Sequence, residues 1–90
     1  MIYVINMVKK MSDIQILVGE RIRMLAEKID LSITFLAYDS NIDRSHISKI
    51  INGHVNVSME SLEIICTALG VSVSEFFNDG VFEKNNNTEK

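Results

Sequence analysis

The sequence predicts an all-α fold of five short helices, two of them joined by a tight turn at about residues 32–53. Apolar residues recur at spacings of three and four along most of the chain, which is the period of an amphipathic helix. The intervening segments are short and contain serine, asparagine or glycine, the residues that begin and end helices. No internal repeat, inter-domain linker or clear strand pattern interrupts this order.

The composition indicates one small domain. The 90 residues are 47% hydrophobic and 23% charged, ordinary values for a soluble globular chain. A single cysteine allows no intrachain disulfide and suits a reducing cytoplasm, where we expect the protein to be located. No apolar run approaches the roughly 20 residues of a membrane span. The apolar start precedes Lys9 and Lys10, whereas a secretory signal has its charges first.

The first clear helix is expected to begin at Ser12. Residues 1–11 form an N-terminal extension whose pattern fits either a strand or a helical lead-in. The segment from Ser12 to Gln15 matches a capping box, in which the glutamine side chain reaches back to the amide of the cap. The helix should end near residue 30, with Arg21 on its solvent side. Its apolar stripe consists of Ile14, Leu17, Val18, Ile22, Leu25 and Ile29.

The next helix and its turn follow from three residue types. Ser32 is a good N-cap for a helix that runs to about residue 40 and carries Phe35 and Leu36. Asn41 stands where the chain must turn sharply. Asparagine tolerates the left-handed conformation better than most residues with a side chain.

The third helix is predicted between a cap at Asp43 and a left-handed C-cap at Gly53. Ile47 and Ile50 should be buried. Two helices, a turn of three or four residues and a polar second helix are the elements of a helix-turn-helix. The exposed side of this second helix is polar and partly basic, with Arg44, Ser45, His46, Ser48 and Lys49.

Two further helices are predicted before a C-terminal tail. Ser58 caps the fourth helix and Gly70 ends it. Its core stripe includes Cys66, which we interpret as a buried structural thiol. A second capping-box match over 72–75 starts a short fifth helix. We expect residues 79–90 to be a frayed tail.

The charge pattern leaves room for a DNA-binding face. The net charge of −3 argues mildly against a nucleic-acid partner. Residues 1–59, however, contain seven basic and six acidic residues, whereas residues 60–90 contain two basic and six acidic ones. The acidic residues therefore gather away from the third helix, and a DNA-binding protein needs a local basic face rather than a basic chain.

Several segments, in their order and spacing, resemble the lambda-repressor-like, Cro/C1-type (XRE) family of DNA-binding domains. The resemblance covers about residues 17–77 and implies one helix-turn-helix DNA-binding domain at residues 12–78. The run 36–48 is especially similar to the controller proteins of restriction–modification systems, which are small dimeric regulators. The matching segments are 19–23, 31–32, 36–37, 42–48, 53, 58–62, 68–72 and 76–77.

Three positions depart from the family pattern. The family usually has glutamine at the first position of its second helix, where it helps hold a phosphate, and this chain has Ile33. The family often pairs an arginine in the first helix with a glutamate late in the third, and this chain has Ala26 and Ile51 there. Replacing both halves of a buried ion pair by apolar residues is often neutral or stabilising. Val57 replaces a proline in the loop after the third helix.

The resemblance implies a double-stranded DNA operator as the partner. Arg44 is the leading candidate, because it can bind a guanine edge bidentately or hold a phosphate. Asp43 is expected to be mainly a helix cap, and residues after Lys49 are expected to position the protein on the backbone. The predicted DNA-binding residues are Thr34, Asp43, Arg44, Ser45, His46, Ser48, Lys49, Asn52, His54 and Asn56.

A homodimer is expected, because one module of this size contacts too few bases for strong specificity. The dimer surface should be apolar and lie away from the third helix. The candidates are Met59, Ile64, Val73, Phe76, Phe77 and Phe82.

The sequence leaves two classes of function open. The leading one is a sequence-specific transcriptional regulator, either a restriction–modification controller or a small phage-type repressor. The other is an antitoxin-like or other protein-interaction module with the same fold. Neither a cofactor nor a metal is expected: the glycines are scattered at helix ends, and His46 and His54 lack the spacing of a zinc site. No enzymatic constellation is predicted.

Overall fold

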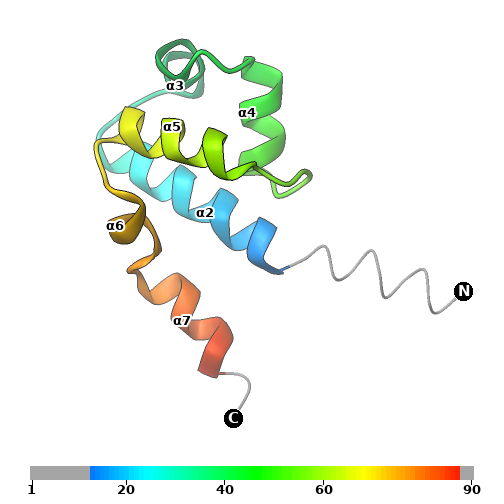
Figure 1. Cartoon of the computed structure of the whole chain (residues 1–90), viewed down its shortest axis with the longest axis vertical. Coiled ribbons are helices and arrows are strands. Elements are labelled where there is room, and N and C mark those ends of the chain that lie inside the picture. The colour runs from blue at the N-terminus through cyan, green and yellow to red at the C-terminus, as the bar shows by residue number, and fades with distance from the viewer. Residues whose placement is uncertain (1–12, 88–90) are drawn as a thin grey trace, which may run out of the picture.

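The computed structural model describes residues 13–87, with side chains to residue 83, and this part of the chain is entirely helical. The all-α fold class is confirmed. Figure 1 shows α3 and α4 at one end of the molecule and α6 and α7 at the other. The predicted start at Ser12 and the extension over 1–11 lie outside the described residues. The helices are α2 (Asp13–Lys28), α3 (Ile33–Ser40), α4 (Arg44–Ile51), α5 (Met59–Leu69), α6 (Val73–Phe77) and α7 (Gly80–Asn87).

The helix ends form where the predicted capping residues stand. Ser32 Oγ accepts from the Phe35 amide at 3.1 Å at the start of α3. Asn41 ends that helix with φ 57°, and Gly70 ends α5 with φ 79°. The capping box that begins α6 at Ser72 is present. One predicted cap is wrong: Asp43 precedes α4, but its side chain makes no capping hydrogen bond.

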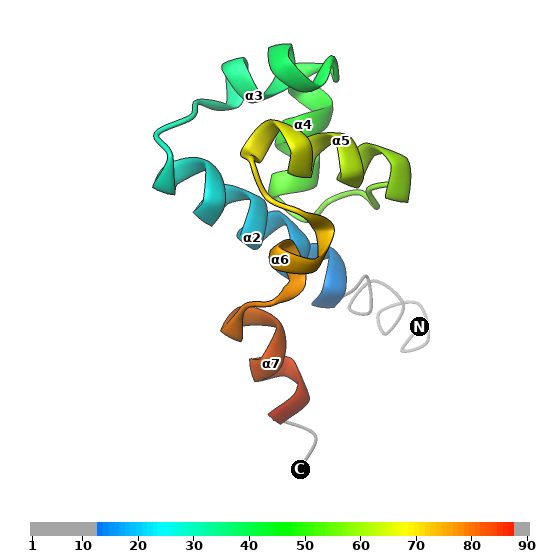
Figure 2. The same ribbon diagram turned by 60° about the vertical axis from the view of Figure 1, so that its left-hand side comes forward.

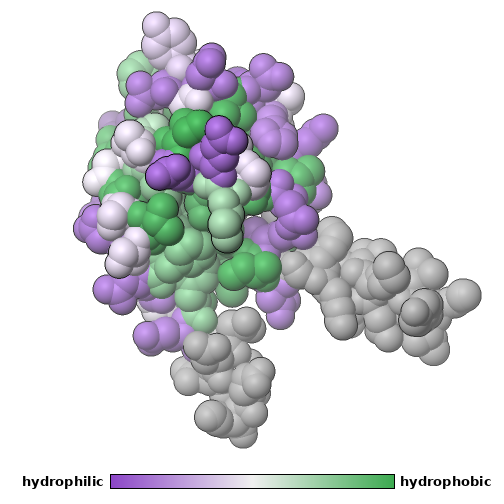
Figure 3. All heavy atoms as spheres, viewed as in Figure 1, coloured by the Kyte–Doolittle hydropathy of each residue, from purple (hydrophilic) through white to green (hydrophobic). Residues whose placement is uncertain are grey.

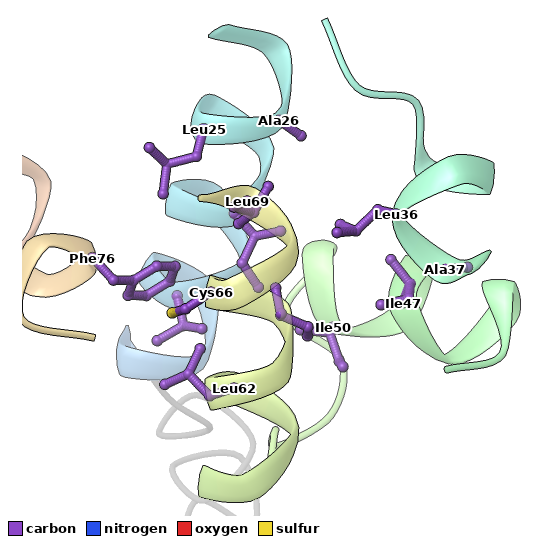
Figure 4. Close-up of a cluster of buried hydrophobic side chains, with 13 residues drawn as sticks. Leu25, Ala26, Leu36, Ala37, Ile47, Ile50, Leu62, Cys66, Leu69 and Phe76 are labelled. Atoms are coloured by element: carbon purple, nitrogen blue, oxygen red, sulfur yellow. The ribbon is translucent and has the colours of Figure 1, made fainter. Parts of the chain in front are cut away.

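The core lies between α2, α3, α4, α5 and α6. Leu36, Ile65 and Phe76 are completely shielded from solvent. Figure 4 shows Phe76 reaching from α6 toward Cys66 on α5, which is itself 1% exposed. Ile47 and Ile50 on α4 are also 1% exposed. The core stripes predicted for the third and fourth helices, which are α4 and α5 in the structure, are therefore confirmed. The stripe of the first helix is shorter than predicted, since its end members Ile14 and Ile29 are about half exposed, at 53% and 49%.

Arg21 is partly buried in the structure, whereas the sequence placed it on the solvent side of its helix. Its Nε donates to the Phe76 carbonyl at 2.7 Å, and its Nη2 donates to the Glu75 carbonyl at 3.0 Å. Its Nη1 pairs with Asp79 at 3.3 Å, with the two side chains 12% and 28% exposed. Both carbonyls lie in the last turn of α6, where few backbone donors are available, and the Glu75 carbonyl also accepts from the Asn78 amide at 3.2 Å. Arg21 therefore fixes α6 against α2.

The predicted frayed tail is wrong for most of its length, because residues Gly80–Asn87 form α7. Asp79 Oδ2 accepts from the Val81 amide at 3.0 Å at the start of this helix. Phe82 packs on Phe77 with ring centroids 5.0 Å apart. Figure 2 shows α7 extending from the rest of the bundle. None of the helices in the described part of the chain is long and apolar enough to cross a membrane.

Candidate nucleic-acid interface

The helix α4 has one apolar and one polar side. Ile47 and Ile50 are 1% exposed, so they fix the rotation of the helix on the core. Residues spaced by three or four share a helix face. Ser45, Lys49 and Asn52 follow that spacing on the side opposite the buried isoleucines, and all three are exposed. The prediction of a polar, partly basic outer face on this helix is confirmed.

Most of the ten predicted DNA-binding residues are accessible. Ser48 is partly buried, and the other nine are exposed. Exposure does not test a DNA contact, so their role remains a prediction. They group as two residues at the start of α3 and in the turn (Thr34, Asp43), five in α4 (Arg44, Ser45, His46, Ser48, Lys49) and three after it (Asn52, His54, Asn56).

A hydrogen bond joins the starts of the two helices of the helix-turn-helix. Arg44 Nε donates to Thr34 Oγ1 at 2.9 Å. The sequence predicts the two residues as separate contacts, and no local pattern pairs them. Within the described part of the chain, no carboxylate lies within ion-pair distance of Arg44. Its positive charge therefore stays available at the surface.

The start of α3 offers backbone donors as well. The first amides of a helix have no carbonyl partner within it, and they carry the positive end of the helix dipole. The Ser32 side chain accepts from the amide of Phe35, so the amides of Ile33 and Thr34 are not used by that cap. The Ile33 side chain packs against the hydrophobic core. Ile33 stands where the family usually has glutamine. Its apolar side chain therefore stabilises the helix start without blocking the backbone donors there.

The segment after α4 is held by backbone geometry and by α2. Gly53 has φ 77°, its amide bonds to the Ile50 carbonyl, and the His54 amide bonds to the Lys49 carbonyl. The predicted left-handed end at Gly53 is confirmed. Gln15 donates from Nε2 to the Gly53 carbonyl at 3.3 Å, and its predicted contact with Ser12 lies outside the described residues. The contact between Gln15 and Gly53 fixes the exit from α4, where His54 is exposed.

Sequence reasoning missed an aromatic pair on the outer side of α3. Phe35 is 51% exposed and Tyr38 is 79% exposed, with ring centroids 6.1 Å apart. Their spacing of three residues, both aromatic, was the available signal.

Cys66 has no role at this surface. The thiol is buried between α5 and α6, and burial raises its pKa despite the opposing effect of the nearby Arg21 charge. A neutral, enclosed thiol is a poor nucleophile. The interpretation of Cys66 as a core residue is confirmed.

The predicted dimer residues do not form one exposed set. Phe76 is 0% exposed and belongs to the core, so its assignment to a dimer interface is wrong. Phe82 is partly buried against the core. The exposed members are Met59 (88%), Val73 (42%), Ile64 (40%) and Phe77 (38%).

The sequence of this region is matched by a family model described as a Cro/C1-type HTH DNA-binding domain, which covers residues 21–79. The chain belongs to this helix-turn-helix family. The resemblance seen in the sequence is thus confirmed. The chain is also similar to the control protein C.MunI from a Mycoplasma species, with 43% identity over 70 residues, or 77% of this chain and 95% of that protein.

Solved structures of controller proteins share the fold. The restriction–modification controller protein C.AhdI from Aeromonas hydrophila has a TM-score of 0.68 and 33% identity, covering 70% of this chain and 96% of that chain. The controller protein C.Esp1396I, solved as a tetramer with its natural 35 base-pair operator, has a TM-score of 0.74 and 32% identity over 81% of this chain and 95% of that chain. This Cro/C1-type chain is therefore similar to restriction–modification controllers in both sequence and fold.

Proposed function

We propose that the protein is a sequence-specific transcriptional regulator that binds a palindromic operator as a homodimer and controls restriction–modification genes. The observation that carries the proposal is the exposed polar face of α4, which begins at Arg44 and has its apolar side fixed on the core. A helix anchored in this way can enter the major groove with its N-terminal residues at the base edges. The similarity to controller proteins supports the choice of regulated genes.

The positions of the exposed residues determine which of them we expect to contact bases and which to contact phosphates. Arg44 and Ser45 stand at the N-terminal end of α4, where base contacts are made in this motif. Lys49 stands one turn later and supplies charge for a phosphate. The amides at the start of α3 are suited to a second phosphate, since a helix N-terminus binds anions. Base contacts then specify the sequence, and phosphate contacts fix the register.

A dimer would place two copies of α4 on half-sites about 34 Å apart, one turn of DNA. An apolar hollow of about 210 Å³ lies near the C-terminal end of α4, at the opposite end of that helix from Arg44. Met59 and Phe77 line it, and Ile14 contributes from α2. Figure 3 shows apolar surface gathered over α5, α6 and the beginning of α2. We propose that this surface, the hollow with Met59, Phe77 and Ile14, forms the dimer interface.

Replacing Arg44 with alanine tests the DNA-binding proposal. Specific affinity for the promoter DNA of its own operon should fall by about 1–3 kcal/mol, the contribution of a bidentate base contact. Circular dichroism should remain unchanged, because Arg44 is exposed. Gel shifts at several salt concentrations measure the effect.

Arg23→Ala is the matched control for this experiment. It removes the same charge, but Arg23 pairs only with its helical neighbours Glu20 and Glu27 among the described residues, so its loss should change specific affinity little. Equal affinity of the wild-type protein for promoter and random DNA would reject sequence-specific regulation. No salt-sensitive DNA binding, together with co-purification of a neighbouring gene product, would favour the antitoxin-like alternative.

Replacing Met59 with glutamate tests the dimer surface. The residue is 88% exposed in the single chain, so the change should leave folding intact. A charge buried at an apolar interface should weaken dimerisation by about 2 kcal/mol, as for a central interface residue. Sedimentation velocity over a concentration series measures the change.

The Ile64→Glu variant tests which side of α5 forms the dimer interface. Ile64 lies five residues after Met59, roughly 140° around the helix, and is 40% exposed. Its replacement should leave the monomer–dimer equilibrium unchanged. If Ile64→Glu dissociates the dimer and Met59→Glu does not, the interface lies on the other side of α5.

A further inference from the structure

We infer that Thr34 is a positioning residue for Arg44 and thereby a determinant of base specificity, an inference that rests on the proposed DNA-binding function. The observation is the hydrogen bond from Arg44 Nε to Thr34 Oγ1, at 2.9 Å. It links the first turn of α3 to the first residue of α4. The two helix starts that face DNA in this motif are thus joined through side chains as well as through the turn.

The hydrogen bond decides which edge of the guanidinium remains available. Arginine has five N–H donors in a planar fork. With Nε engaged by Thr34, the pair of Nη atoms is left to form two parallel hydrogen bonds end-on. Guanine presents two adjacent acceptors, O6 and N7, in the major groove, and a bidentate arginine is the commonest specific contact to them. Thr34 therefore orients Arg44 for guanine recognition.

The Thr34 side chain is held rigidly, which suits it to position Arg44. This side chain is β-branched and has few accessible rotamers in a helix. It stands next to Ile33, whose side chain packs on the core, and two residues after Ser32, whose hydroxyl is fixed as the helix cap. Arg44 in contrast has a long, flexible side chain. Because the rigid Thr34 side chain already holds the flexible Arg44 side chain, less conformational entropy is lost when the arginine binds DNA.

Thr34 keeps one donor of its own. A threonine hydroxyl has one O–H and two acceptor lone pairs. Accepting from Arg44 leaves the O–H free to donate to a phosphate oxygen. A simple phosphate contact by Thr34 is therefore the rival explanation for any loss of affinity, and the experiment must separate it from positioning.

A double-mutant cycle separates them, with Thr34→Val, Arg44→Ala and the combined variant. The probe is a duplex selected by the wild-type protein from random-sequence DNA, compared with unselected random DNA. Thr34→Val, which keeps the shape and removes the hydroxyl, should lower selected-site affinity by about two- to ten-fold. In the Arg44→Ala background it should cause no further loss. Thr34→Ser, which keeps the hydroxyl, should restore binding.

A readout on the free protein accompanies the cycle. The Arg44 Hε proton should exchange slowly with solvent in the wild-type and Thr34→Ser proteins and rapidly in Thr34→Val, as measured by ¹⁵N NMR. Additive losses in the cycle, or equal losses on selected and unselected DNA, would show an independent phosphate contact and overturn the inference alone. Equal wild-type binding to both DNAs would overturn the proposed function and this inference with it.

Discussion

Replacing Gly19 with alanine should lower the free energy of unfolding by about 2 kcal/mol. A Cβ atom at this position would lie 2.5 Å from the Ile50 carbonyl oxygen and closer still to that of Ile51. Overpacking typically destabilises by about 1–3 kcal/mol, and rigid helix backbone on the opposing side puts this position at the upper end. Alanine's better helix propensity, about 1 kcal/mol over glycine, offsets only part of the loss. Urea denaturation followed by circular dichroism measures it.

Gly80→Ala is the control for Gly19→Ala. Gly80 begins α7, and a Cβ atom there would meet no neighbouring atom within 4 Å, so alanine should be neutral or slightly stabilising. A Gly19→Ala variant as stable as wild type would mean that α2 and α4 separate easily. The close approach at Gly19 would then not hold α4 in place.

The helix ends and the core could be predicted from the sequence because their causes are local or periodic. Ser32, Asn41 and Gly70 act within a few residues of themselves, and each stands at its predicted helix end. Ile47 and Ile50 follow the helical period and are buried. These signals need no knowledge of the tertiary structure.

The side-chain contacts between distant segments could not be predicted in the same way. Arg21 looks like a solvent-exposed residue on its own helix, and only the position of α6 gives it the Phe76 carbonyl as a partner. Likewise α7 contains consecutive asparagines, which favour helices weakly. Its formation follows from the local cap at Asp79 and from Phe82, which packs on Phe77 and against the core, and only this packing is a tertiary effect.

The candidate site also combines features that the sequence predicts with features that depend on the tertiary structure. The polar side of α4 follows from the period, so Arg44 and Lys49 could be placed at the surface from sequence. The hydrogen bond between Thr34 and Arg44 depends on the angle between two helices, which the turn residues do not specify by themselves. The structure therefore adds orientation to residues that the sequence alone could identify.

Replacing Ile51 with glutamate should destabilise the fold by about 3 kcal/mol, the lower end for an uncompensated buried charge. Ile51 is partly buried at the end of α4 and packs against the core, and its carbonyl contacts α2 at Gly19. Ala26, the position that carries the arginine in the family pattern, is 5% exposed and apolar here. A single glutamate at Ile51 therefore has no arginine to pair with. Thermal and urea unfolding measure the loss.

Two further variants separate charge from packing at Ile51. Asn52→Glu introduces the same charge at the next, exposed residue, so it should leave stability nearly unchanged. Ile51→Val removes one methylene without adding charge and should lower stability by only about 1 kcal/mol. If Ile51→Glu were no worse than Ile51→Val, the end of α4 would be hydrated. In that case the absence of both the arginine and the glutamate at positions 26 and 51 would have no energetic basis.

A double variant tests whether the missing arginine causes the loss of stability in Ile51→Glu. Adding Ala26→Arg to Ile51→Glu should recover part of the stability, because the two charges then offset each other as in the family pattern.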